Sequence, residues 1–138
     1  MDKELLKDNL ENSVKNLEVI KESVYYYTNC KQGVLHHIAE NSIRFSIICI
    51  FTYTENYLKI VLNELTLGDY ISDLDSSIDV ALSRNLIDKG FSRIIKKNKN
   101  LQYSSITPNL NIEILIDFYF EIEAHYKKQI QLIRNLLG

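Results

Sequence analysis

The stretch that decides the fold runs from Leu35 to Leu65 and reads LHHIAENSIRFSIICIFTYTENYLKIVLNEL. Its apolar residues recur every three or four positions, which is the period of a helix. The β-branched residues between Ile47 and Tyr53 would also suit a strand. However, no turn residue interrupts the pattern between Gly33 and Gly68, so its length favours one long helix. One face of that helix is predicted to carry Ile43, Ile47, Ile50, Phe51, Tyr57, Leu58, Val61 and Leu65.

Further apolar residues extend around this helix beyond a single face. A helix that is apolar on more than one side needs more than one neighbour. We expect one face to enter the core and part of the other to form a subunit interface, which predicts a homodimer. The residues of the second set are Phe45, Ile48, Cys49, Tyr53, Ile60 and Leu62.

A second long amphipathic helix is predicted before this one, from about Lys3 to the Tyr25–Tyr27 run. Charged side chains fill one face, and Gly33 follows as the break. The inward face is predicted to carry Leu6, Leu10, Val14, Leu17, Ile20 and Val24.

Two short helices and one long helix are predicted after Gly68. Ser72 or Asp73 can cap the first short helix, and Asp88 can cap the second. An irregular segment, Leu101–Thr107, precedes Pro108 and the last helix. Together these helices are predicted to form an all-α up-and-down bundle of four to five helices, with residues 1–138 as a single domain. The last helix is predicted to bury Ile112, Leu115, Ile116, Tyr119, Ile122, Tyr126, Ile130 and Ile133.

Composition supports this fold class and excludes several others. The 138 residues include only 4 Gly and 1 Pro, too few for the many turns of a β-sandwich or a Rossmann-type fold. The net charge of −2 argues against a polybasic nucleic-acid arm, and 46% hydrophobic residues argue against disorder. Two cysteines, Cys30 and Cys49, make neither a disulfide scaffold nor a zinc framework.

The sequence also predicts a soluble, cytoplasmic protein. Its charged start, Met1–Glu4, is unlike a signal peptide. The most apolar stretch, Ile43–Phe51, contains Arg44 and is too short and too polar to span a bilayer. We therefore expect no membrane partner.

Three motifs resemble those of a known family. Ser42-Ile43-Arg44-Phe45, with Tyr53 and Tyr57-Leu58-Lys59 after it, resembles the "QRFE…W…L" helix of the nucleotidyltransferase substrate-binding-like proteins, a branch of the HEPN superfamily. The segment Asp79–Asp88 resembles that family's "A…GLID" motif. Lys99-Asn100-Leu101 falls where the family has Arg-Asn-Leu. The resemblance covers roughly Leu5 to Leu136.

This resemblance implies a helical bundle, usually homodimeric, that bacteria often encode beside a small nucleotidyltransferase as a toxin–antitoxin pair. Active HEPN proteins are metal-independent RNases with an Arg, a polar residue that is often Asn, and a His four to six residues after the Arg. The Arg stabilises charge on the phosphate, and the His transfers a proton.

The chain departs from this catalytic pattern. Lys99 stands at the Arg position, where it can bind a phosphate only as a point charge, and Asn100 is retained. The positions of the histidine hold Tyr103, Ser104 and Ser105, and serine cannot shuttle protons near pH 7. We therefore expect a chain that is not an RNase or is a poor one. At the family's adenylyl-acceptor tyrosine stands Ile106, with Tyr103 as a weak substitute.

A local basic cluster surrounds the motif position. Its members are Arg93, Lys96, Lys97 and Lys99. Two interpretations stay open, a solvated helix face and a phosphate or nucleotide contact. No Gly-rich phosphate loop accompanies the cluster.

The histidines do not predict a metal site. His36 and His37 are adjacent and point about 100° apart on a helix, so they suit one metal poorly. Glu121 and His125 share a face, but a di-iron bundle needs two Glu-x-x-His repeats, and the chain has only this one pair, four residues apart. We expect neither a metal nor a cofactor.

The function expected first is a non-catalytic or degenerate HEPN-type subunit that binds a small nucleotidyltransferase. Two alternatives stay open: a weak metal-independent RNase that uses the Lys99/Asn100 region, with RNA or a nucleotide as ligand, and a purely structural helical interaction protein.

Overall fold

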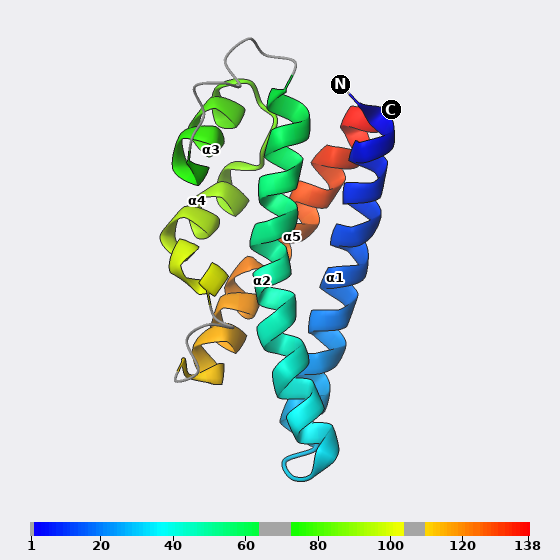
Figure 1. The fold of residues 1–138 in the computed structure, drawn as a ribbon, viewed down its shortest axis with the longest axis vertical. Helices are drawn as coiled ribbons and strands as arrows, with labels where there is room; N and C mark the ends of the chain where they lie inside the picture. Colours follow the sequence, from blue (N-terminus) through cyan, green and yellow to red (C-terminus); the bar gives the residue numbers. More distant parts are fainter. Residues whose placement is uncertain (1, 64–72, 104–109) are drawn as a thin grey trace.

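A computed structural model describes residues 2–63, 73–103 and 110–138, and every regular element among them is helical (Figure 1). This confirms the all-α bundle and the choice of a helix over a strand at residues 47–53. Leu65 and Pro108 lie outside the described residues. The elements are α1 (Lys3–Asn29), α2 (Val34–Leu62), α3 (Leu74–Ser83), α4 (Lys89–Lys97), the 3-10 helix η2 (Lys99–Tyr103) and α5 (Ile112–Leu137).

The three long helices pack side by side, and the short ones cover one flank. α1 and α2 form an antiparallel hairpin, and α5 contacts both of them. α3 and η2 contact α2, while α4 packs on α5. Because α5 runs antiparallel to α1, the start of α1 and the end of α5 lie at the same end of the bundle (Figure 1).

Helix caps and one glycine set the boundaries. Asp73 accepts a hydrogen bond from Ser76 N at 2.6 Å, and Asp88 accepts one from Phe91 N at 2.9 Å. Asp88 was predicted as a cap, and Asp73 was one of two candidates with Ser72, which lies outside the described residues; a carboxylate satisfies a free N–H of the first turn. Gly33 has φ +87°, a left-handed conformation that suits glycine and breaks the chain between α1 and α2.

The predicted irregular segment at Leu101–Thr107 is wrong in its first part. Residues 99–103 form η2, in which Leu101 N donates to Asn98 O at 2.9 Å. Leu101 is buried and anchors this otherwise polar stretch to the core. Residues 104–107 lie outside the described part of the chain.

The hydrophobic core takes side chains from every described helix, most of them from α2 and α5. The predicted inward face of α5 is confirmed, with Ile116 half-buried and the others buried. The first predicted face of α2 is buried at each described position, and Phe51 stacks on Phe118 with ring centroids 5.8 Å apart. From the second set, Cys49 and Leu62 are also buried, whereas Phe45 is 68% exposed.

The predicted inward face of α1 is confirmed: Leu6, Ile20 and Val24 are buried, and the other three predicted residues are half-buried and pack against the core. The sequence did not predict the polar residues that are buried beside them and bond to α2: Asn9 Nδ2 donates to Tyr53 O at 2.9 Å, and Asn16 Nδ2 donates to Ser46 O at 3.0 Å. These small polar side chains allow α1 to approach α2 closely. Which residues of α1 are buried therefore depends on their contact with α2 as well as on their hydrophobicity. The buried polar residues of α1 are Asn9, Ser13, Asn16 and Ser23.

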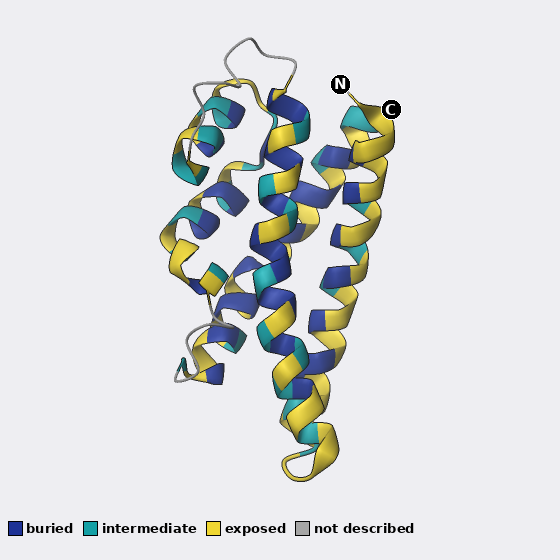
Figure 2. Cartoon of the chain, viewed as in Figure 1, coloured by how far each residue is buried: buried dark blue, intermediate teal, exposed yellow. Residues whose placement is uncertain are grey.

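The hairpin of α1 and α2 projects beyond the start of α5 (Figure 1). We name this projection, residues 19–29 and 34–45, the arm. Its surface is largely exposed, in contrast to the buried middle of the bundle (Figure 2). Several large apolar side chains of the arm are exposed: Val19, Tyr25, Tyr26, Val34, Leu35, Ile38 and Phe45.

By length and composition alone, α2 could cross a membrane. The argument that the apolar stretch is too short therefore fails for the complete helix, which extends well beyond Ile43–Phe51. More than half of its most apolar window is buried inside the bundle, as in the core helix of any packed bundle.

Candidate functional site

The basic cluster lies at the end of α4 and the start of η2. Its lysines are paired with carboxylates: Lys96 with Asp79, Lys97 Nζ with Glu121 Oε1 at 3.5 Å, and Lys99 Nζ with Asp75 Oδ2 at 2.8 Å. Asp75 and Asp79 belong to α3, and Glu121 belongs to α5. The three ammonium groups therefore point to two different helices and do not converge on one point.

Lys99 is exposed and held as a cation. The hydrogen bond from its ammonium group to Asp75, together with the negative charge of Asp75, raises the pKa of Lys99. A lysine with a raised pKa cannot act as a base near neutral pH. It can still bind an anion, but only in competition with Asp75.

The remaining motif residues are exposed or lie outside the described part. Asn100 and Tyr103 are exposed at η2, and Ser104 lies outside the described residues. Arg93 is exposed on α4 and makes no ion pair with any described residue. No histidine among the described residues contacts Lys99 or Asn100.

A histidine does contact the other end of α4. The His125 ring packs on Gly90, and its Nδ1 lies 3.8 Å from the Asp88 carboxylate. The sequence predicts that Glu121 and His125 share a face, but it does not predict Asp88 as the neighbour. Glu121 pairs with Lys97 and not with His125, so no ligand trio forms. The described residues contain no group of three or more His, Cys, Asp or Glu that could hold a metal.

The two adjacent histidines contact each other edge-on, with ring centroids 6.1 Å apart, but only His36 packs into the turn. His36 stacks on Tyr27 with ring centroids 4.3 Å apart, and its Nδ1 lies 2.9 Å from Cys30 O. His37 is exposed. The contacts of His36 with Tyr27 and Cys30 tie the start of α2 to the end of α1.

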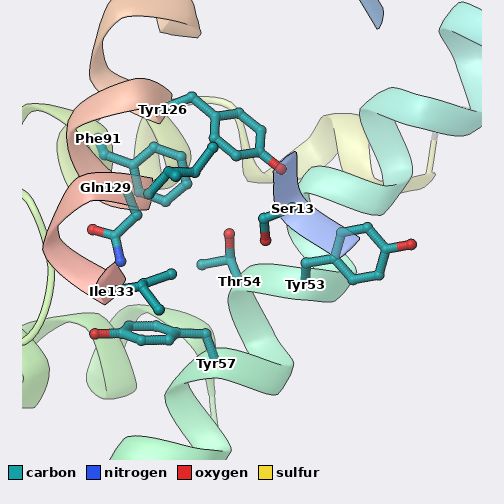
Figure 3. Close-up of a pocket in the computed structure, with 9 residues that line it drawn as sticks. Ser13, Tyr53, Thr54, Tyr57, Phe91, Tyr126, Gln129 and Ile133 are labelled. Atoms are coloured by element: carbon teal, nitrogen blue, oxygen red, sulfur yellow. The ribbon is translucent and has the colours of Figure 1, made fainter. Parts of the chain in front are cut away.

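A small pocket lies inside the bundle, between α1, α2, α4 and α5 (Figure 3). Its volume is about 10 Å³. Tyr53 is half-buried, and every other lining residue is buried. Six of its nine lining residues carry a hydroxyl or an amide group beside apolar side chains, a mixture that the periodicity of the sequence does not reveal. The lining consists of Ser13, Tyr53, Thr54, Tyr57, Phe91, Tyr126, Gln129, Ile130 and Ile133.

Burial dominates the protonation chemistry of this pocket. Burial raises the pKa of Tyr126 to about 12, while hydrogen bonds with Asn16 and Ser13 oppose this shift. Burial also raises the pKa of Tyr57, whose hydroxyl donates to Leu86 O. Both phenols are therefore neutral at physiological pH and act as hydrogen-bonding groups.

Exposed apolar residues form the other notable surface. On α2, Val34, Ile38 and Phe45 are spaced by four and seven residues, so they share one helix face. Their exposed fractions are 74%, 57% and 68%. Of these three residues only Phe45 belongs to the second apolar set predicted for this helix, and the exposure of Val34 and Ile38 was not predicted.

The motifs that resemble the HEPN superfamily lie on α2, on the α3–α4 segment and on η2. No protein family, no curated protein and no solved structure matches the chain, so the resemblance rests on these motifs alone.

Proposed function

We propose that this chain is a non-catalytic helical subunit of the HEPN type, which pairs with a second copy through the arm and binds a small nucleotidyltransferase. The observation that carries the proposal is the uncovered apolar face of α2 formed by Val34, Ile38 and Phe45. Over these residues the face is about 16 Å long, at 1.5 Å per residue. Exposed apolar faces of this kind mark protein interaction sites.

The basic cluster supports a binding role over catalysis. Lys96, Lys97 and Lys99 are each paired with a carboxylate, and no described histidine lies beside Lys99. An RNase site of the HEPN type would need a proton-transferring group there. The weak RNase remains the alternative function.

The oligomeric state tests the pairing. We expect light scattering to give a dimer for the wild type and a monomer for Phe45→Glu, because a buried unpaired carboxylate is costly. Phe120→Glu is a matched control, since Phe120 has a similar exposed fraction of 64% but lies on α5 outside the arm. A wild-type monomer, or equal dissociation by both substitutions, would contradict pairing through the arm.

Affinity purification from the native host tests the partner. We expect mass spectrometry to identify a small nucleotidyltransferase that co-purifies in a fixed ratio. Recovery of the tagged chain without any nucleotidyltransferase would count against this part of the proposal.

An RNA-cleavage assay tests the alternative. We expect Lys99→Ala and Asn100→Ala to leave any background cleavage unchanged, with Lys15→Ala as a surface control. A large and selective loss in the first two variants would favour the RNase.

A further inference from the structure

We propose that two copies of the chain pair through antiparallel α2 helices, with their Asn41 side chains meeting on the two-fold axis at the centre of the interface. This orientation rests on the proposed function, which assigns the arm to pairing, and it adds how the copies face each other and which residue sets their register. The interface would be one stripe of α2, formed by Val34, Ile38, Asn41, Phe45 and Ile48.

The stripe has the spacing of a helix that packs on another helix. Its residues are separated by four, three, four and three positions, which is the repeat of a two-helix seam. All of them are exposed except Ile48, which is half-buried. The opposite side of α2 carries the buried Ile43, Ile47 and Ile50 and faces the bundle. The neighbouring helices therefore leave the stripe accessible to a second copy.

The order of residues along the stripe is symmetric about Asn41. Two apolar residues precede it and two follow it, and beyond Ile48 the same side of α2 becomes polar, with Thr52 and Lys59 exposed. In an antiparallel pair centred on Asn41, the first apolar half of each stripe lies on the second half of the other, which is the self-complementary contact of a two-fold dimer. A parallel pair continued along α2 would set each Lys59 beside its own copy, where like charges repel.

The amide group of Asn41 would set a single register for this pair. It contains both a donor and an acceptor, so two such amides that face each other across a two-fold axis can each donate to the other's oxygen. A shift of one helix along the other would bury each amide against apolar side chains, where an unpaired polar group is costly. A single asparagine within an apolar seam specifies the register of helix pairs for this reason.

The shape of the bundle leaves room for antiparallel arms. Phe51 of α2 stacks on Phe118, which lies six positions after the start of α5. Because the two helices run in the same direction, α5 begins near the level of Phe45, and the arm projects beyond it (Figure 1). Two arms that overlap about Asn41 would therefore place each bundle beyond the tip of the other arm.

Distances between spin labels test the orientation. In a chain with Cys30→Ser and Cys49→Ala, the substitution Asn56→Cys provides one site for a nitroxide label at an exposed position of α2. Asn56 lies 15 positions after Asn41. At 1.5 Å per residue, an antiparallel pair would hold the two labels about 45 Å apart, whereas a parallel pair would hold them within about 20 Å.

We expect double electron–electron resonance to give the long distance, and the added substitution Phe45→Glu to abolish the dipolar coupling as the pair dissociates. A short distance in a chain that light scattering shows to be dimeric would overturn the antiparallel orientation but not the pairing through the arm. A labelled chain that is monomeric, like the unlabelled wild type, would overturn both.

Substitutions at position 41 test the role of the amide. Asn41→Asp would bring two carboxylates together on the two-fold axis, so we expect the dissociation constant measured by analytical ultracentrifugation to rise at least about tenfold. Asn12→Asp is the matched control, because it makes the same change at an exposed position of α1 outside the arm. Asn41→Leu should keep the pair but broaden the distance distribution, since no amide then sets the register. Equal dissociation constants for the two aspartate variants, or an unchanged distribution for Asn41→Leu, would overturn the role assigned to Asn41.

Discussion

Gly90 leaves room for the imidazole ring of His125 at the start of α4. A Cβ atom added at Gly90 would overlap Nδ1 and Cε1 of that ring, although alanine is normally the better helix former. Glycine is therefore needed at position 90 because of His125, which lies 35 positions later in the sequence. Periodicity predicts helices but not this contact.

This contact makes a prediction at the level of single residues. Gly90→Ala should lower the free energy of unfolding by roughly 1–3 kcal/mol, because it overpacks the site. In a His125→Ala background, the same substitution should be neutral or stabilising, since the ring is gone and only the helix propensity of alanine remains. Urea unfolding of the four proteins measures both steps. An equal effect of Gly90→Ala in both backgrounds would show that the ring moves aside without cost.

The candidate site shows the same limit of sequence reasoning. The positions of Lys96, Lys97 and Lys99 were predicted as a basic cluster, and the structure places them together at the end of α4. Their partners Asp79, Glu121 and Asp75 are 17, 24 and 24 positions away and depend on how α3 and α5 pack. Local sequence contains no signal for such pairs, so the neutralisation of the cluster could not be predicted.

The first turn of α4 is stabilised by its capping residue, Asp88. Asp88 accepts from Phe91 N and also faces His125. Asp88→Ala should lower the free energy of unfolding by about 1 kcal/mol, while Asp88→Asn should cost much less, because asparagine keeps an oxygen that caps the helix. Urea unfolding measures the difference, with Asp73→Ala and Asp73→Asn at α3 as the matched pair. If Asp88→Asn costs as much as Asp88→Ala, the charge beside His125 matters more than the cap.

Elements were predictable where local rules apply. The caps Asp73 and Asp88, the break at Gly33 and the inward face of α5 follow from turn chemistry and helical periodicity. The inner face of α1 was not predictable in the same way, because Asn9 and Asn16 are buried by hydrogen bonds to carbonyl groups of α2. Hydrophobicity alone assigns such residues to the surface.

At the scale of the whole bundle, buried tyrosines predict sensitivity to alkali. The pKa of Tyr126 is raised from 10.0 to about 12 in the folded chain, so above pH 10 the unfolded chain loses a proton that the folded chain keeps. The stabilisation is fully present below pH 10 and is lost as the pH rises toward 12, by up to about 3 kcal/mol. Urea unfolding at pH 8 to 11 measures this slope. It should be shallower in Tyr126→Phe and unchanged in the exposed control Tyr25→Phe.

The two chain ends lie at one end of the bundle, and the turn between α1 and α2 lies at the opposite end. A fluorescent label or an affinity tag fused to either terminus would therefore stand a full helix length from the turn at the tip of the arm (Figure 1). Energy transfer between labelled copies would then report their orientation: a head-to-head pair joined by the tips of its arms would hold the labels far apart, while copies laid alongside each other in parallel would bring them together.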